Sequence, residues 1–86
     1  MWAFTFKARA ERDFRRLPHD IQARVAEKVR GWMQHANPLE CAEPLAGPLK
    51  PLWRFRIGDY RLIVEPDIPH KKIAILRVAH RRDVYR

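Results

Sequence analysis

Four arginines in the second half of the chain have the chemistry and spacing to bind phosphate. Arg54 and Arg56 lie two residues apart, Arg61 follows a Gly-Asp pair, and Arg81 lies nearer the C-terminus. A guanidinium group donates two parallel hydrogen bonds to a phosphate and does not lose its proton. Each arginine taken alone is most simply a solvated surface residue, but together they predict a phosphate-binding surface.

Two residues close to Arg81 are candidates for proton transfer. His80 stands immediately before Arg81, and Tyr85 is the penultimate residue. A neutral imidazole accepts a proton, whereas a guanidinium is a very poor acceptor. The alternatives are a structural or exposed role for His80 and, for Tyr85, an apolar contact that holds the tail on the core.

The other potential ligands and nucleophiles form no pattern that predicts a metal or a cofactor. The single cysteine, Cys41, cannot form an internal disulfide and lies in a proline-rich segment without an assigned base. The remaining histidines have no zinc-type spacing with it; they are His19, His35 and His70. We therefore expect no metal and no cofactor.

The charge of the chain favours a polyanionic partner, with nucleic acid as the first candidate. Eighteen Lys and Arg outnumber ten Asp and Glu, giving a net charge of +8. The 86 residues, 47% of them hydrophobic, predict one domain spanning residues 1–86, too small for a large substrate cavity. We see no membrane-spanning run and no export signal, and with the lone cysteine this favours a cytoplasmic protein.

Changes of hydrophobic period divide the N-terminal half into a strand and two helices. Large apolar residues alternate with small ones over residues 2–6, which predicts a half-buried strand. Apolar residues then recur at helical spacing over 7–17 and over 18–37, with Pro18 between the two helices. Four prolines between positions 38 and 51 argue against regular structure there, so we expect an irregular surface crossing.

The C-terminal half is predicted to form three strands. The segments with strand patterns are residues 53–57, 60–65 and 72–78. Gly58-Asp59 between the first two indicates a β-hairpin with a two-residue turn, and a loop begins at Pro66. The element order β-α-α-β-β-β predicts an α+β fold, an N-terminal helical hairpin packed on a small antiparallel-rich sheet.

Hairpin geometry places three of the arginines on one face. A two-residue turn sets Arg56 opposite Arg61 and Arg54 opposite Ile63. Like charges directly opposite each other destabilise a sheet by ~0.2–1 kcal/mol, so folding gains nothing from the cluster. The apolar residues that alternate with the arginines are expected to face the core, so the arginines face outward. The acids that could neutralise it are Glu11, Asp13 and Glu65.

Several stretches resemble the RelE/ParE superfamily of toxins from type II toxin–antitoxin systems, and most of all its RelE-type messenger-RNA interferases. The resemblance covers nearly the whole chain. The stretches that carry it are Leu17-Pro-x-x-Ile-Gln22, Leu45-Ala-Gly47, Leu52-Trp-Arg-Phe-Arg-Ile-Gly-Asp-Tyr-Arg-Leu-Ile63, Val78-Ala-His-Arg81 and Val84-Tyr85. The gyrase-poisoning ParE branch shares much of the central run, which therefore indicates the superfamily more firmly than the activity.

The resemblance implies metal-independent cleavage of RNA, in which the ribose 2'-hydroxyl attacks the phosphate. Carried over by position, the phosphate-binding residues would be Arg54, Arg56, Arg61 and Arg81, and the catalytic residues Arg61, Arg81, His80 and Tyr85. The best-known relatives have lysines on the first hairpin strand, where this chain has Arg54 and Arg56. Proton removal would therefore fall to His80 or Tyr85.

The resemblance also implies partners and leaves two alternatives. The partners would be a cognate antitoxin whose flexible segment folds around the toxin, and messenger RNA presented by the ribosome. The alternatives are a ParE-like inhibitor of DNA gyrase without ribonuclease activity and a catalytically inactive nucleic-acid-binding relative. His80 beside Arg81, together with Tyr85, favours the ribonuclease.

Overall fold

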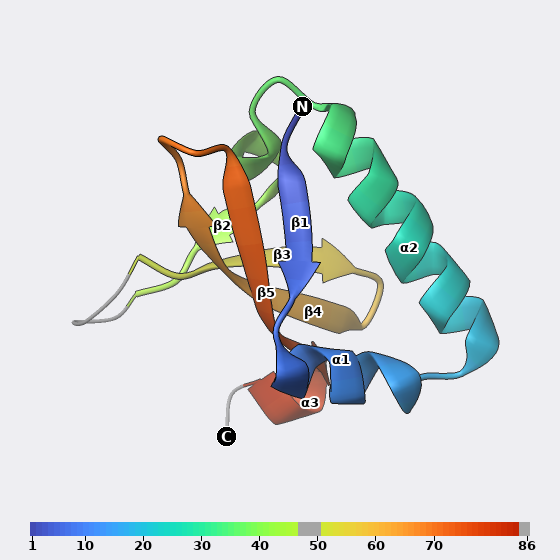
Figure 1. Cartoon of the computed structure of the whole chain (residues 1–86). Coiled ribbons are helices and arrows are strands. Elements are labelled where there is room, and N and C mark those ends of the chain that lie inside the picture. The colour runs from blue at the N-terminus through green and yellow to red at the C-terminus, as the bar shows by residue number, and fades with distance from the viewer. Residues whose placement is uncertain (47–50, 85–86) are drawn as a thin grey trace.

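The computed structural model describes residues 1–46 and 51–84 of the chain (Figure 1). Its elements are β1 (Ala3–Phe6), α1 (Ala8–Arg15), α2 (His19–Gln34), the 3-10 helix η1 (Pro38–Cys41), β2 (Glu43–Pro44), β3 (Trp53–Ile57), β4 (Tyr60–Asp67), β5 (Lys72–His80) and α3 (Arg81–Val84). The two longer helices and the hairpin lie where the hydrophobic periods predict them. None of the helices in these ranges is long and apolar enough to cross a membrane.

The strands form one mixed sheet in the order β1-β5-β4-β3-β2. Three of the pairings are antiparallel, whereas β1 runs parallel to β5 with Phe6 opposite Ile75. A parallel pair needs a long connection, and the helices and the hairpin between β1 and β5 provide it. The α+β class and the helical hairpin are confirmed, and the parallel pair at β1 is an addition that the local pattern did not predict.

The proline-rich segment is more regular than we expected, because it contains η1 and β2. The Asn37 side chain accepts a hydrogen bond from the Leu39 N–H at 3.2 Å, and Pro38 occupies the start of the helix, where its missing N–H costs nothing. Pro44 lies in β2, which pairs with β3 and forms an edge of the sheet among the described residues. The expectation of an irregular crossing is therefore wrong for the described part of this segment.

Strands β4 and β5 also continue beyond their predicted ends. β4 runs through Pro66, which we expected to begin a loop, and β5 runs as far as His80. Pairing between the two strands keeps both chains extended, and a bulge at Ile63/Val64 adjusts their register. His80 consequently belongs to the sheet and not to an irregular tail.

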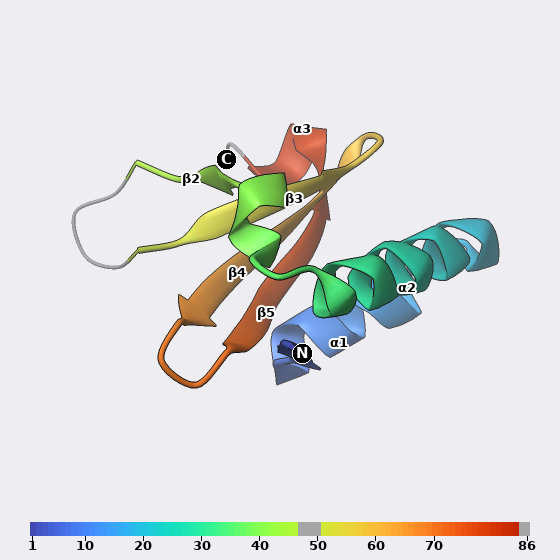
Figure 2. The same ribbon diagram turned by 90° about the horizontal axis from the view of Figure 1, so that it is seen from above.

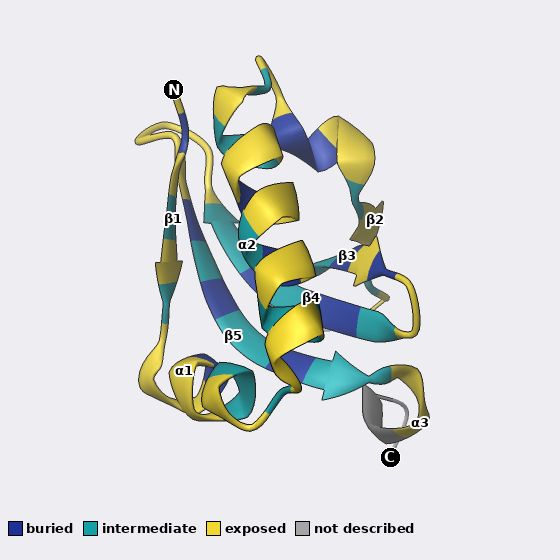
Figure 3. Cartoon of the chain, turned by 90° about the vertical axis from the view of Figure 1, so that its right-hand side faces the viewer, coloured by how far each residue is buried: buried dark blue, intermediate teal, exposed yellow. Residues whose placement is uncertain are grey.

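The hydrophobic core lies between α2 and one face of the sheet, and both long helices lie on that side (Figures 2 and 3). At its centre the Phe55 ring stacks on Trp32 with ring centroids 4.1 Å apart, and Phe4 packs against Phe55 at 5.9 Å. The buried hydrophobic residues are Trp2, Ala10, Val25, Val29, Leu39, Phe55, Ile57, Leu62, Val64, Ile73, Ile75 and Val78. This core fixes which side chains of β3 and β4 point away from the helices.

Helix α1 closes the edge of β5 beyond the end of β1. The Lys7 N–H donates to the Ile75 carbonyl at 2.9 Å, as the last backbone contact of β1. The Asp13 carboxylate then accepts hydrogen bonds from the Val78 N–H and from Arg77 Nε, both at 2.9 Å. The sequence analysis proposed Asp13 as an acid for the hairpin arginines. In the structure it is instead hydrogen-bonded to the edge of β5.

Replacing Asp13 should destabilise the fold. In Asp13→Ala the Val78 N–H loses its acceptor, and an unsatisfied buried donor costs about 1–3 kcal/mol. Urea denaturation should show this loss in the free energy of unfolding, while Glu27→Ala, a substitution on the exposed surface of α2, should change it little. Equal stability of the two variants would contradict this role for Asp13.

Candidate nucleic-acid interface

The hairpin register is the predicted one and gathers Arg54, Arg56 and Arg61 on one face. Arg56 pairs with Arg61, and Arg54 pairs with Ile63. Successive side chains of a strand point to opposite faces, and Phe55 and Leu62 are fully buried on the helix side. The three arginines therefore lie on the face of the sheet that turns away from α2, and we call this surface the arginine face.

Arg61 is the residue that departs most from a solvated surface arginine, because only 6% of it is exposed. Its Nη1 donates to the backbone carbonyls of Gly58 at 2.8 Å and Tyr60 at 2.9 Å. Its Nε is buried and has no hydrogen-bond partner among the described residues, and no carboxylate of that part of the chain pairs with it. A buried guanidinium without a counter-charge costs folding free energy, and the two carbonyls offset only part of this cost.

Arg54 and Arg56 share one carboxylate, that of Glu43. Arg54 Nη2 lies 2.8 Å from Glu43 Oε2, and Arg56 Nη1 lies 3.7 Å from Oε1. The hydrogen bond and the charge of Arg54, with a smaller contribution from Arg56, lower the pKa of the Glu43 carboxyl below its ordinary value of 4.5. Two guanidinium groups on one carboxylate leave the arginine face positively charged.

Sequence reasoning missed Glu43. It proposed Glu11, Asp13 and Glu65 as acids for the arginines, but Glu11 pairs with Arg15 and Asp13 with Arg77. Glu43 reaches the hairpin because β2 pairs with β3 and sets Glu43 opposite Arg54. That pairing joins two segments across a proline-rich stretch, and no local sequence pattern predicts it.

The hairpin turn brings Arg81 next to Arg61. Gly58 has a φ of +57°, the left-handed conformation that a tight two-residue turn requires. The Gly58 carbonyl accepts from Arg61 Nη1, and the neighbouring Asp59 carbonyl accepts from the backbone N–H of Arg81 at 2.6 Å. The Arg81 side chain is 63% exposed, with Nε 4.0 Å from Asp59 Oδ1. Arg61 and Arg81 are thus held at adjacent carbonyls of one turn.

His80 is not brought together with Arg61. It pairs with Tyr60 across β4 and β5, one position beyond the pair of Arg61 and Ala79, so it points to the opposite face. The His80 and Tyr60 rings meet edge to face at 5.4 Å, and His80 Nδ1 accepts from the Arg82 N–H at 3.3 Å. Tyr85, the other proton-transfer candidate, lies outside the described residues.

The arrangement is suited to binding a phosphodiester through fixed charges. The Arg61 side chain and the Arg81 backbone are both hydrogen-bonded to the turn, and Arg54 and Arg56 extend the charge along β3. Within the described residues no group of three His, Cys, Asp or Glu side chains could hold a metal ion. Guanidinium groups are therefore the charged groups that this surface offers to a phosphate.

The ion pair of Glu43 should make stability depend on pH. A carboxyl whose pKa is lowered by folding stabilises the protein above its ordinary pKa of 4.5, and this contribution is lost as the pH falls through the folded-state pKa. Glu43→Gln should therefore lower the thermal midpoint at pH 7, and its difference from wild type should shrink as the pH falls below 4.5.

An Arg54→Gln background provides the control, because Arg54 is the main cause of the lowered pKa. In that background Glu43→Gln should have a smaller effect at pH 7. Thermal unfolding followed by circular dichroism gives the four midpoints at each pH. A difference between wild type and Glu43→Gln that is the same at pH 3 and pH 7 would contradict the assignment.

Comparison with known proteins shows which family the sequence matches. A family model described as the ParE toxin of type II toxin–antitoxin system, parDE, matches residues 4–85. The chain is 40% identical over 81 residues to Toxin RelG of Mycobacterium tuberculosis, covering 94% of this chain and 92% of that protein. It is 38% identical over 79 residues to Toxin RelE of the same organism, covering 92% and 80%.

Solved structures share the fold. In the toxin–antitoxin complex RelBE2 of Mycobacterium tuberculosis, one chain superposes with a TM-score of 0.82 and 34% identity, over 92% of this chain and 96% of that one. The isolated Escherichia coli RelE toxin superposes with a TM-score of 0.71 and 19% identity, over 99% and 92%, a likeness of fold alone.

Proposed function

The chain belongs to the family of ParE toxins of type II toxin–antitoxin systems, and from that premise we propose that it is an endoribonuclease that cleaves messenger RNA without a metal ion. It is a toxin of the RelE/ParE type, and its curated relatives carry the names RelG and RelE. The activity on RNA is the step that the proposal adds.

One observation carries the proposal: Arg61 is buried without a carboxylate partner in the described chain and sits beside Arg56 and Arg81. The two carbonyls that Arg61 contacts carry no full negative charge, so they do not neutralise the cation, and burying it costs free energy. A phosphate of the substrate would supply the missing counter-charge. The free energy needed to immobilise and desolvate the guanidinium is then supplied during folding, so it does not add to the barrier of the reaction.

The proposed chemistry assigns the arginines to the charge that develops on the phosphate. The 2'-hydroxyl loses its proton to His80 or Tyr85 and attacks the phosphorus, and the non-bridging oxygens gain negative charge. The P–O5' bond then breaks as the 5'-oxygen takes that proton, which leaves a 2',3'-cyclic phosphate. Arg61 and Arg81 clamp the scissile phosphate from the two sides of the hairpin turn. Arg54 and Arg56 bind that phosphate or its neighbour, after exchanging Glu43 for the substrate.

Proton transfer is assigned to His80 or Tyr85, because the arginines are very poor proton acceptors. His80 lies at the end of β5 directly before Arg81, on the helix side of the sheet, so it serves a phosphate that reaches round that end. Tyr85 follows α3 in the sequence. Only one of the two is needed to deprotonate the 2'-hydroxyl, and the variants below separate them.

We propose a cognate antitoxin as the protein partner and the ribosome as the site that presents messenger RNA. Structures related to this chain are described as toxin–antitoxin complexes. A flexible antitoxin segment that folds on binding can place acidic or apolar side chains on the arginine face and so block it. Inhibition would then follow from occupation of the phosphate site.

Arg61→Ala should strongly slow the cleavage of messenger RNA. Loss of one hydrogen-bond donor to the developing charge lowers the rate roughly 10²–10³-fold. Loss of the proton-transfer group lowers it roughly 10²–10⁴-fold, so the variant of His80→Ala and Tyr85→Phe that shows this loss identifies the group. Controlled expression followed by mapping of messenger-RNA 5' ends measures cleavage. The control is Arg30→Ala, which removes an exposed arginine of α2 and should cleave as the wild type does.

Undiminished cleavage in folded Arg61→Ala, His80→Ala and Tyr85→Phe variants would refute the mechanism.

The second candidate function is inhibition of DNA gyrase, because the matched family is that of the parDE systems. Intact messenger RNA together with supercoiling defects in the same cells would assign the chain to the inhibition of DNA gyrase.

A further inference from the structure

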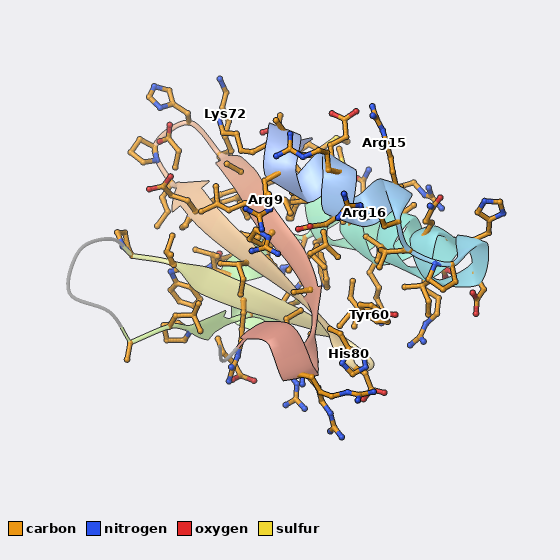
Figure 4. All side chains as sticks on the ribbon, turned by 90° about the horizontal axis from the view of Figure 1, so that it is seen from below. Arg9, Arg15, Arg16, Tyr60, Lys72 and His80 are labelled. Atoms are coloured by element: carbon orange, nitrogen blue, oxygen red, sulfur yellow. The ribbon has the colours of Figure 1, made fainter. Side chains whose placement is uncertain are left out.

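A shallow pocket of about 260 Å³ opens at the edge of β5, between that strand and the end of α1. Tyr60 and His80 line it from the paired ends of β4 and β5, and Arg16 and Leu17 line it from the turn that follows α1. Figure 4 shows Tyr60 and His80 together beside α3, with Arg16 on the neighbouring end of α1. The pocket thus combines an aromatic ring, an imidazole and a guanidinium.

The ring groups of the pocket are held in place. Tyr60 and His80 meet edge to face at 5.4 Å, and the Arg82 N–H donates to His80 Nδ1 at 3.3 Å. In the described part of the chain His80 Nε2 has no hydrogen-bond partner. A flat ligand that enters the pocket therefore meets a fixed aromatic wall.

The pocket is also positively charged. Its one carboxylate, Asp13, is already occupied by Arg77 Nε and the Val78 N–H, each at 2.9 Å. Arg16 is exposed and pairs with no carboxylate in the two described ranges. An anionic group beside the flat ligand would give Arg16 the partner that it lacks.

Arginines continue from this pocket round the end of the sheet to the arginine face. The Arg24 guanidinium lies against the turn, with Nη2 3.3 Å from where a Cβ on Gly58 would stand. The arginines at this end of the sheet are Arg16, Arg24, Arg61, Arg77, Arg81 and Arg82. The described carboxylates among them are Asp13 and Asp59, so a polyanion can follow a positive path from one face to the other.

We propose that this pocket binds one unstacked base of the RNA strand whose phosphates lie on the arginine face, an inference that rests on the proposed function. Proteins hold single-stranded RNA by stacking its bases on aromatic rings and guanidinium planes while cationic groups follow the backbone. The two sites are joined by consecutive residues, Tyr60 with Arg61 and His80 with Arg81. The strand therefore bends round the end of β4 and β5, and the pocket selects a base beside the cleaved phosphate.

The test uses a short 2'-O-methyl RNA, which lacks the attacking hydroxyl, with 2-aminopurine placed at each position in turn. In the wild-type protein one position should change its fluorescence when the base enters the pocket. Tyr60→Leu should remove that change and weaken binding about 5- to 150-fold, the usual effect of losing one stacked base, whereas Tyr60→Phe should retain both. Arg16→Gln should lower the dependence of log K on log salt by about 0.7.

Arg30→Gln is the matched control, since it removes an equally exposed arginine from α2. Wild-type affinity and fluorescence in both Tyr60→Leu and Arg16→Gln would overturn the pocket assignment. If these variants bind RNA normally but lose affinity for the antitoxin, the pocket is a protein-binding site and the proposal is wrong. Cleavage in cells that depends on Arg61 would in either case leave the proposed function standing, and failure of the wild type to bind any of these RNAs would overturn the pocket assignment alone.

Discussion

The carbonyl groups of the Gly58–Asp59 turn hold the candidate site together. The Gly58 carbonyl accepts from the Arg61 side chain, and the Asp59 carbonyl accepts from the backbone of Arg81, the first residue of α3. The positive φ of Gly58 lets the turn close in two residues, which sets the register of the whole hairpin. A shift of one residue would move Arg61 to the helix side and replace it on the outer face by an apolar neighbour.

The arginine face illustrates a cost that folding alone does not explain. Arg61 is desolvated without a counter-charge in the described chain, and Arg56 stands directly opposite it. Glu43 offsets part of the repulsion by bridging Arg54 and Arg56, yet it leaves the surface positive. In a domain this small the core has little stability to spare, so a cluster that opposes folding supports the proposal that this surface binds an anion.

The alternation of side chains along the strands divides the chemistry of the molecule between two faces. Guanidinium groups gather on the outer face, while the imidazole of His80 and the ring of Tyr60 lie on the side of the helices. Consecutive residues thus serve different surfaces that meet only at the end of the sheet. Because Asp13 of α1 bonds to the edge of β5, that end is also where α1 is hydrogen-bonded to the sheet.

Local sequence determined the helices, the hairpin and the side of the hairpin on which its arginines lie, because hydrophobic period and a two-residue turn act over a few residues. It also carried the resemblance to the toxin family. The sequence left open the parallel pairing of β1 with β5, the contact of Glu43 with Arg54, and the separation of His80 from Arg61. Only the tertiary structure decided these, since each depends on pairing between segments far apart in the chain, and strand pairing carries no signal in either segment alone.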